Sequence, residues 1–126
     1  MFIFDVTHQS LEAGLHGSNL RAQALAQNMA NINTAGYRRV DTDFHAQLSQ
    51  AISQGQASGQ ANPTLDPRFP VTADQAATAV RADGNTVDVD QEGARVAENA
   101  LEYQGISQLL GLRRRMLETA MRTSGV

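Results

Sequence analysis

The residue types in this chain that could carry chemistry begin with a histidine pair near the amino terminus. His8, Glu12 and His16 follow one another at intervals of four, so a helix would place them near one face. Such a face could in principle hold a metal ion, and a small metal-dependent hydrolase using His8 and His16 is therefore one alternative. No further ligand cluster accompanies the pair, and a polar helix face with ion pairs explains the spacing better. We expect no metal site here.

Other catalytic or binding patterns also fail on their spacing. An acidic stretch suggests a calcium loop, but Gly84 comes too early and no glutamate stands at the twelfth position. Turn and helix-cap chemistry explains that stretch better. No Gly-x-Ser-x-Gly is present, and Gly55 and Gly59 bracket a Gln/Ser linker rather than a phosphate cradle. We therefore predict a protein that is not an enzyme, with no cofactor and no small-molecule substrate. The acidic stretch comprises Asp83, Asn85, Asp88 and Asp90.

Composition narrows the class further. The chain has 126 residues, 41% of them hydrophobic, with ten basic residues against thirteen acidic ones and no cysteine. A formal charge of −3 argues against a nucleic-acid partner. No apolar run approaches the roughly 20 residues that span a bilayer, and Met1 to Asp5 lacks the features of a secretory signal. The length allows one domain, and its large core residues are few.

The first region predicts one long helix from about His8 to Asn33. Small or apolar residues recur in alternating steps of three and four, which is the spacing of a coiled-coil seam. Thr7 or Ser10 is the expected amino-terminal cap, and the segment from Asn31 to Gly36 should end the helix and turn the chain. The seam residues are Leu11, Leu15, Ser18, Ala22, Leu25, Met29 and Ile32.

The middle region has little to bury. A short helix is compatible with Phe44 to Ser53, whereas Gly55 to Pro70 contains all three prolines and should be a loop that only a neighbouring element would order. Between Val80 and Val89, the Asp83–Gly84 pair suggests a small hairpin or an extended turn.

The last region predicts a second long helix, from about Asp88 to Arg122, with Asp88 as its cap. Gly93, Gly105 and Gly111 interrupt this helix and weaken it. At 1.5 Å per residue the two helices would span roughly 40 and 50 Å, far beyond the ~14 Å radius of gyration of a compact chain this long. The simplest expectation is therefore that other copies of this chain, or other chains, cover the seams. The second seam comprises Val96, Ala100, Tyr103, Ile106, Leu110, Arg113, Leu117 and Ala120.

Two sequence blocks resemble a known family. The first block is Asn19–Gln23 followed by Gln27–Arg38. It is similar to the amino-terminal signature of flagellar rod, hook and hook–filament junction proteins, with Ala35 where that family commonly has proline. The other block resembles the carboxy-terminal block of the short proximal rod proteins. The first block contributes Asn28, Ala30, Asn31, Asn33, Thr34, Gly36 and Tyr37, and the other contributes Gly84, Asn85, Thr86, Val87, Asp88, Asn99, Tyr103 and Gln104.

The resemblance implies a mainly α protein whose two terminal helices pair as an antiparallel coiled coil in the inner part of a flagellar rod. It divides the chain into a rod helix with its signature turn (1–36), an irregular outer segment with a short hairpin (37–87) and a second rod helix (88–126). Implied partners are other copies, other rod proteins, the adaptor of the membrane ring and the flagellar type III export gate. The implied location is the basal-body rod crossing the periplasm, reached without a cleaved signal. Another rod component and a cytoplasmic helical adaptor or export chaperone are the alternatives.

Overall fold

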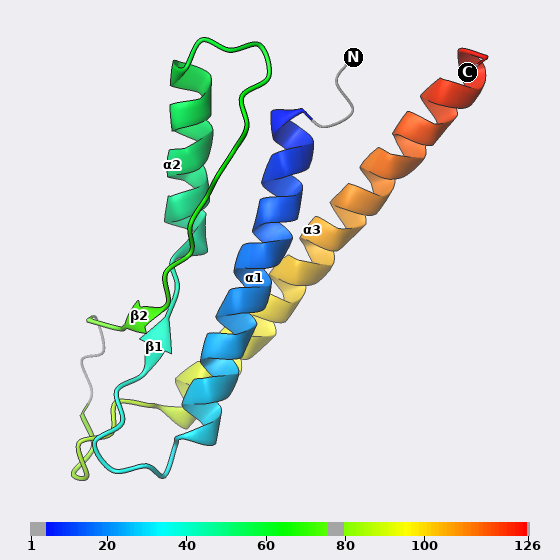
Figure 1. The fold of residues 1–126 in the computed structure, drawn as a ribbon. Helices are drawn as coiled ribbons and strands as arrows, with labels where there is room; N and C mark the ends of the chain where they lie inside the picture. The colour runs from blue at the N-terminus through cyan, green and yellow to red at the C-terminus, as the bar shows by residue number, and fades with distance from the viewer. Residues whose placement is uncertain (1–4, 76–79, 126) are drawn as a thin grey trace.

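The computed structural model describes residues 5–75 and 80–125, and most of them are helical. Three helices, α1 (Val6–Ala30), α2 (Phe44–Ala57) and α3 (Val89–Thr123), are joined by irregular segments that contain the short strands β1 (Val40–Asp41) and β2 (Thr72–Ala73). Figure 1 shows α1 between α2 and α3. The predicted mainly α fold, with long terminal helices that pack against each other, is confirmed.

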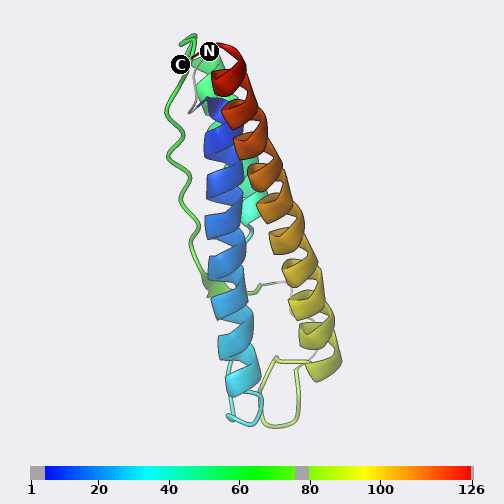
Figure 2. The ribbon, with the colours of Figure 1, turned by 90° about the vertical axis from the view of Figure 1, so that its right-hand side faces the viewer.

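Polar contacts near both ends show how α1 and α3 are aligned. Asp5, just before α1, forms an ion pair of 2.6 Å with Arg113 in the later half of α3. Near the other end of α1, the Asn28 amide donates to a Glu92 carboxylate oxygen in the first turn of α3, at 3.1 Å. Residues 114–123 of α3 therefore extend past the start of α1, and Figures 1 and 2 show the end of α3 reaching beyond the first turn of α1.

The caps of the long helices come from aspartates. The Asp5 carboxylate accepts the His8 amide hydrogen and caps α1, so the prediction of Thr7 or Ser10 is wrong. Ser10 lies inside the helix, where its hydroxyl donates to the Val6 carbonyl. Asp88 caps α3 as predicted, accepting from the amides of Asp90 and Gln91.

A glycine in α1 allows α2 to approach closely. A β-carbon on Gly17 would lie 2.7 Å from the β-carbon of Phe44, which is closer than any real packing contact. Phe44 is buried at the start of α2 and meets Phe69 edge to face, with ring centroids 6.3 Å apart. The core is small, as the composition suggested; its buried apolar residues in the described part of the chain are Ala24, Leu25, Phe44, Phe69, Val87 and Leu110.

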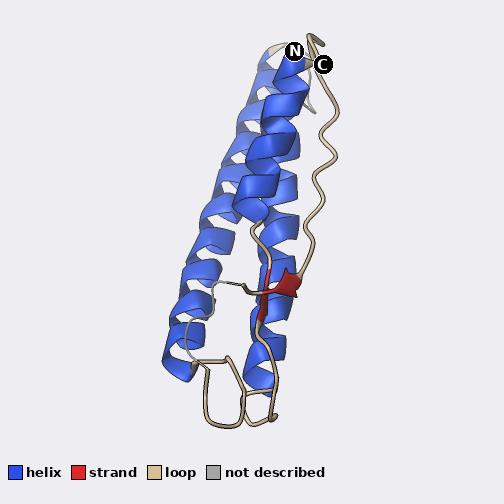
Figure 3. Cartoon of the chain, turned by 90° about the vertical axis from the view of Figure 1, so that its left-hand side faces the viewer, coloured by secondary structure: helices blue, strands red, loops and turns tan. Residues whose placement is uncertain are grey.

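The loop from the end of α2 to β2 runs alongside the helices (Figure 3). The predicted helix from Phe44 is confirmed and extends to Ala57. The following loop is held by the side chain of Gln9, which donates to the Pro63 carbonyl at 3.2 Å and accepts from the Leu65 amide at 2.8 Å. The neighbour that orders this loop is thus α1.

Of the small hairpin or extended turn predicted between residues 80 and 89, the structure has the turn and not the hairpin. The described residues of this stretch form a turn in which the Gly84 amide donates to the Arg81 carbonyl and Gly84 has a φ of +81°. The strand pairing lies elsewhere, because β1 pairs with β2 in antiparallel register, Val40 opposite Ala73. Within this turn the Arg81 amide donates to the Asn85 carbonyl, whereas the Asp83 carbonyl and the Thr86 amide bond to the segment that follows α1, so no strand ladder continues from the turn.

Candidate functional site

The two signature blocks meet at one end of the α1–α3 pair, and we call this region, residues 28–41 and 83–92 together with Asp74, the signature junction. Its backbone contacts join the turn after α1 to the segment before α3. The Gly36 amide donates to the Asp83 carbonyl at 2.8 Å, and the Thr86 amide donates to the Tyr37 carbonyl at 3.0 Å. Sequence segments about fifty residues apart thus form a single local structure.

Asn85 closes the end of α1. Its side-chain amide donates to the carbonyls of Asn31, Ile32 and Thr34, at 2.9, 3.2 and 2.8 Å. Helix ends leave carbonyl groups without partners inside the helix, and a buried carbonyl without a hydrogen bond is costly. Because one fully buried amide serves three carbonyls, Asn85 fixes the path of the chain out of α1.

Two glycines of the junction have backbone conformations that suit glycine. Gly36 has a φ of +71° and Gly84 a φ of +81°, the region that side chains with a β-carbon rarely adopt. A β-carbon on Gly84 would also lie 3.4 Å from the α-carbon of Gly36. These two signature glycines therefore let the blocks turn and approach each other.

Asn28 links three elements through one buried side chain. Its amide nitrogen donates to the Val40 carbonyl at 2.8 Å and to Glu92, while its oxygen accepts from the Val40 amide at 2.8 Å. The same oxygen accepts the Tyr37 hydroxyl at 3.1 Å. Burial, and next the negative charge of Glu92, raise the pKa of the Tyr37 phenol. Asn28 thereby connects α1, β1 and α3.

Arg39 and Glu92 form the charged centre of the junction. Arg39 is 3% exposed, and its Nε donates at 2.6 Å to Glu92, which is wholly buried. Arg39 also binds Asp74 beside β2 and Asp41 in β1. Burial acts to lower the pKa of Arg39, but the hydrogen bonds with Glu92, Asp41 and Asp74 outweigh it and raise that pKa above its usual value. Three chain segments, residues 39–41, the segment of Asp74 and the start of α3, are therefore held around one guanidinium group.

Sequence reasoning missed Arg39, Asp74 and the buried role of Glu92. Glu92 lies in the first turn of a helix, where an acidic residue is expected on the surface as a complement to the helix dipole. Only their positions in the sequence pointed to these residues: Arg39 lies just after the first signature block, and Glu92 follows the cap residue Asp88 closely.

The remaining signature residues take simpler places. Val87 is buried, and the buried Thr86 hydroxyl accepts the Arg39 amide hydrogen at 2.8 Å. Farther along α3, the buried Asn99 amide donates to the Ser18 carbonyl at 2.9 Å. The exposed signature residues are Ala30, Asn33, Thr34, Gly36, Asp88, Tyr103 and Gln104.

The predicted seam residues divide into buried and exposed sets. Leu25 and Leu110 are buried within the chain, and Leu11, Leu15, Ile32, Ile106 and Leu117 are half-buried. An open apolar groove of about 580 Å³ between α1 and α3 is lined by much of the rest. The exposed seam residues that line this groove are Ala22, Met29, Val96, Ala100 and Tyr103, and the buried Ser18 and Leu25 line it as well.

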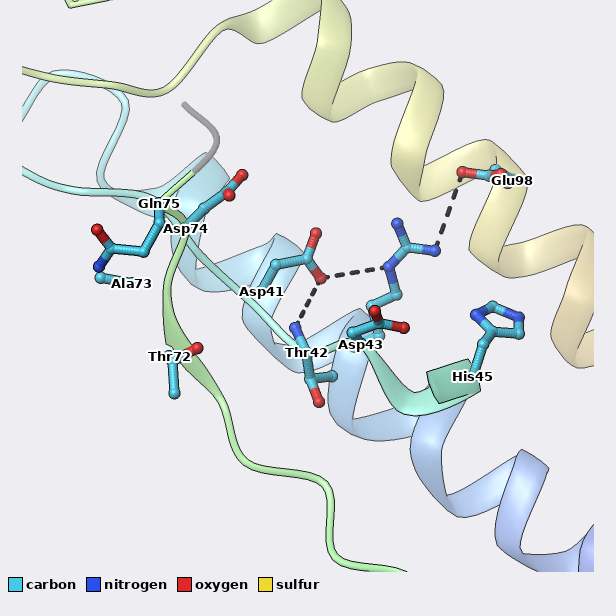
Figure 4. A pocket seen from close by; sticks show the side chains of 10 residues that line it. Asp41, Thr42, Asp43, His45, Thr72, Ala73, Asp74, Gln75 and Glu98 are labelled. Atoms are coloured by element: carbon cyan, nitrogen blue, oxygen red, sulfur yellow. Dashed lines mark hydrogen bonds and ion pairs between the residues drawn. The ribbon is translucent and has the colours of Figure 1, made fainter. Parts of the chain in front are cut away.

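A polar hollow of about 480 Å³ beside the β1–β2 ladder is the place where carboxylates gather (Figure 4). Its acids already have partners: Asp41 binds Arg21 at 3.3 Å, and Asp43 caps α2 by accepting the Ala46 amide hydrogen. Arg21 also reaches Glu98 of α3 at 3.9 Å. The charged side chains of this hollow thus connect α1, β1 and α3, so their role is structural.

The histidine pair is likewise engaged within the fold. His8 pairs with Glu12 at 3.2 Å, and the His16 ring lies 6.0 Å from that of Phe69. Among residues 5–75 and 80–125, no group of three or more His, Asp or Glu side chains could hold a metal ion. No helix in the same ranges has the length and apolarity that a membrane span requires.

These features define a helical structural protein with open apolar faces on its helices. No family model matches the sequence. The flagellar basal body rod protein FlgB of Yersinia enterocolitica is 38% identical to it over 113 residues, covering 74% of this chain and 79% of that protein. FlgB of Escherichia coli K12 is 37% identical with the same coverage, and FlgB of Bacillus subtilis is 27% identical over 96% of this chain and 97% of its own length. The chain belongs to the FlgB family of flagellar basal body rod proteins, which confirms the resemblance of the two signature blocks.

Proposed function

We propose that this chain is a structural subunit of the flagellar basal-body rod, whose copies pack helically around an export channel in the shaft that transmits motor torque. The observation that carries the proposal is the apolar surface that α3 leaves uncovered in a single chain. Large apolar side chains at five positions from residue 101 onward are 43–69% exposed, and exposed apolar patches of this kind mark interaction surfaces. They are Leu101, Leu109, Leu112, Met116 and Met121.

We further propose that α1 and α3 act as an antiparallel coiled coil in the inner part of the rod, with residues 37–87 lying farther out. The two seams and the contacts of Asp5 with Arg113 and of Asn28 with Glu92 support this pairing. In this proposal 1–36, 37–87 and 88–126 are the functional divisions. The exposed seam residues, Met29 and Tyr103 among them, face neighbouring subunits.

The proposed partners are other copies and other rod proteins, together with the membrane-ring adaptor and the export gate. The proposed route is export in an unfolded state without a cleaved signal, followed by assembly across the periplasm. A helix that buries only part of its apolar surface gains stability when a neighbour covers the rest. We therefore propose that the later half of α3 becomes fully ordered on assembly.

The test uses a charge at an exposed apolar position, Leu112→Asp, in a strain that lacks its own rod protein. Leu112 is 45% exposed, so the change spares the chain's core and affects the surface that a neighbour would cover. We expect export to continue while the variant is missing from purified basal bodies and motility is lost. Positions such as Leu25 and Leu110 are unsuitable, because both are buried inside the chain and a charge there would also unfold it.

Thr119→Asp is the matched control, because it adds the same charge at an exposed polar position of the same helix. The control should enter basal bodies normally. Full incorporation of Leu112→Asp would contradict the proposal. Retention of the unmodified protein in the cytoplasm, bound to another flagellar protein, would favour an adaptor or export chaperone instead.

A further inference from the structure

The apolar residues of α1 and α3 repeat at seven-residue intervals, which leaves the alignment of the two helices open. Sliding α3 by seven residues places one member of its seam where the previous member was, so apolar residues again face the α1 seam. The repeat on α3 is Val96, Tyr103, Leu110 and Leu117, and the apolar repeat within α1 is Leu15, Ala22 and Met29.

We propose that polar contacts along the helix pair, the buried ones made by Glu92 and Asn99 above all, select one alignment of α3 on α1 and reject the two alignments shifted by seven residues. We call four of these contacts the register contacts. This inference concerns the fold of the chain itself and stands whether or not the chain forms a rod. The register contacts are Asn28 with Glu92, Ser18 with Asn99, Arg21 with Glu98 and Glu102, and Asp5 with Arg113.

A shift that brings residues seven positions later opposite α1 removes every register contact. Asn28 and Arg39 would then face Asn99 in place of the Glu92 carboxylate, and the Ser18 carbonyl would face Ile106. Arg21 would face Gly105 and Leu109, and Asp5 would face Ala120. The Ser18 carbonyl keeps its helical bond but loses the one from Asn99, and the Arg39 charge loses its most buried partner.

The opposite shift creates repulsive contacts as well. Glu92 would move to the Ser18 carbonyl, so a buried carboxylate would face an oxygen that cannot donate a hydrogen bond. Arg95 would come opposite Arg21, which places like charges together. The junction would be broken too, because Asn85 would leave the three carbonyls that it caps.

Burial explains why polar contacts can decide the alignment. Ser18, Asn28, Glu92 and Asn99 are each at most 4% exposed, so water cannot replace a partner that a shift removes. The seam opposes a shift only weakly, because Val96 and Tyr103 are 43% and 46% exposed in the observed alignment. The polar contacts therefore distinguish the observed alignment from the shifted ones, whereas the apolar contacts oppose a shift only weakly.

Disulfide trapping in the full chain tests the proposal, since the sequence contains no cysteine of its own. Gly14→Cys with Ile106→Cys reports the observed alignment, because a β-carbon on Gly14 would lie 3.3 Å from the Ile106 Cδ1 atom. Gly14→Cys with Arg113→Cys reports the shift by seven; this pair removes the Asp5–Arg113 contact equally in every background, so only the change in the ratio between backgrounds is interpreted. Each pair is oxidised at high dilution and scored as cross-linked monomer, in the parent chain and in the Arg39→Met/Glu92→Leu variant.

We expect the parent to form the first cross-link and the double variant to raise the ratio of shifted to native cross-link about tenfold, on the scale of one lost buried hydrogen bond. Asp66→Leu/Arg68→Met is the matched control: it removes an exposed ion pair and should leave the ratio unchanged. If the double variant loses its helical circular dichroism, Glu92→Gln, which keeps the side-chain size, takes its place. An unchanged ratio in a helical variant, or a parent that fails to form the native cross-link, would overturn the proposal.

Discussion

The two ends of the α1–α3 pair are built in opposite ways. At the signature junction, polar side chains are buried: Asn28, Asn85 and Glu92 are fully enclosed and satisfied by hydrogen bonds within the chain. At the far end, α3 extends beyond the start of α1, and apolar residues such as Met116 and Met121 are exposed. The buried signature residues Asn28 and Asn85 thus hold this chain together, whereas the exposed apolar residues at the far end of α3 include no signature residue.

The largest effect should come from a single change at the junction, Glu92→Leu. Removing this carboxylate leaves Arg39 charged and buried with only its partners Asp74 and Asp41, and breaking a buried pair in this way costs about 3–5 kcal/mol. We expect the free energy of unfolding to fall by that amount, measured by urea denaturation of the isolated chain with circular dichroism as the signal.

The control is Glu98→Leu, less than two turns farther along the same helix. The Glu98 side chain is 63% exposed, and its contact with Arg21 is long, at 3.9 Å. Its replacement should change the free energy of unfolding by no more than about 0.5 kcal/mol. Equal losses of unfolding free energy at the two positions would show that the buried network has no special part in stability. The contrast drawn between the two ends of the helix pair would then be wrong.

A glycine exchange should give the next largest effect. Gly17→Ala places a β-carbon 2.7 Å from the β-carbon of Phe44, so α1 and α2 must separate at a cost of about 1–3 kcal/mol. Gly105→Ala on α3 meets no atom within 4 Å and should stabilise the helix by about 0.5–1 kcal/mol. Thermal unfolding should show a lowered melting temperature for Gly17→Ala and a raised one for Gly105→Ala. A stabilised Gly17→Ala would show that the helices can adapt at this contact.

The sequence predicted the long helices well because their signals are local. Seam spacing, the Asp88 cap and the Gly36 turn each depend on residues within a few positions of one another. The cap of α1 was mispredicted because Asp5, Thr7 and Ser10 all suit an amino-terminal cap, and only the structure shows where α1 begins.

The junction could not be predicted, because its contacts join residues that lie far apart in the sequence. Arg39 and Glu92 are 53 positions apart, and Asn85 caps carbonyls 51 to 54 positions away. Each residue alone has a common surface explanation: a helix-dipole complement for Glu92 and a turn residue for Asn85. The local turn at Gly84 was predictable from the sequence, but the bonds of the Asp83 carbonyl and the Thr86 amide to the turn after α1, which replace a strand ladder, were not.

High pH should weaken the junction end in particular. The pKa of Tyr37 is raised by burial and by Glu92, so the folded state keeps the phenol proton at a pH where the unfolded chain releases it. Stability is therefore fully present below about pH 10 and falls as the pH rises through the pKa of the folded state. The slope from one group cannot exceed about 1.4 kcal/mol per pH unit.

Urea denaturation between about pH 9 and pH 11 measures this slope in the parent chain and in Tyr37→Phe. The variant loses the hydrogen bond to Asn28 at every pH, so its stability should be lower throughout but with a smaller alkaline decline. Tyr103→Phe, at a position that is 46% exposed, is the control and should keep the decline of the parent. Parallel curves for all three proteins would show that Tyr37 does not sense pH through the junction.

Low pH should give the smallest effect, and it should arise at the far end. The pKa of Asp5 is lowered, chiefly by the hydrogen bond from the His8 amide and further by Arg113, so its contribution is present above about pH 4 and is lost as the pH falls through the folded-state pKa. The carboxylate is 39% exposed, and solvent screening should keep the loss below about 1 kcal/mol. Asp5→Asn retains a capping side chain but not the charge, so urea denaturation between about pH 2 and pH 5 should show a shallower acid decline than in the parent. A decline as steep in Asp5→Asn would assign the acid sensitivity to other carboxylates and leave the far end without a charge contact that matters.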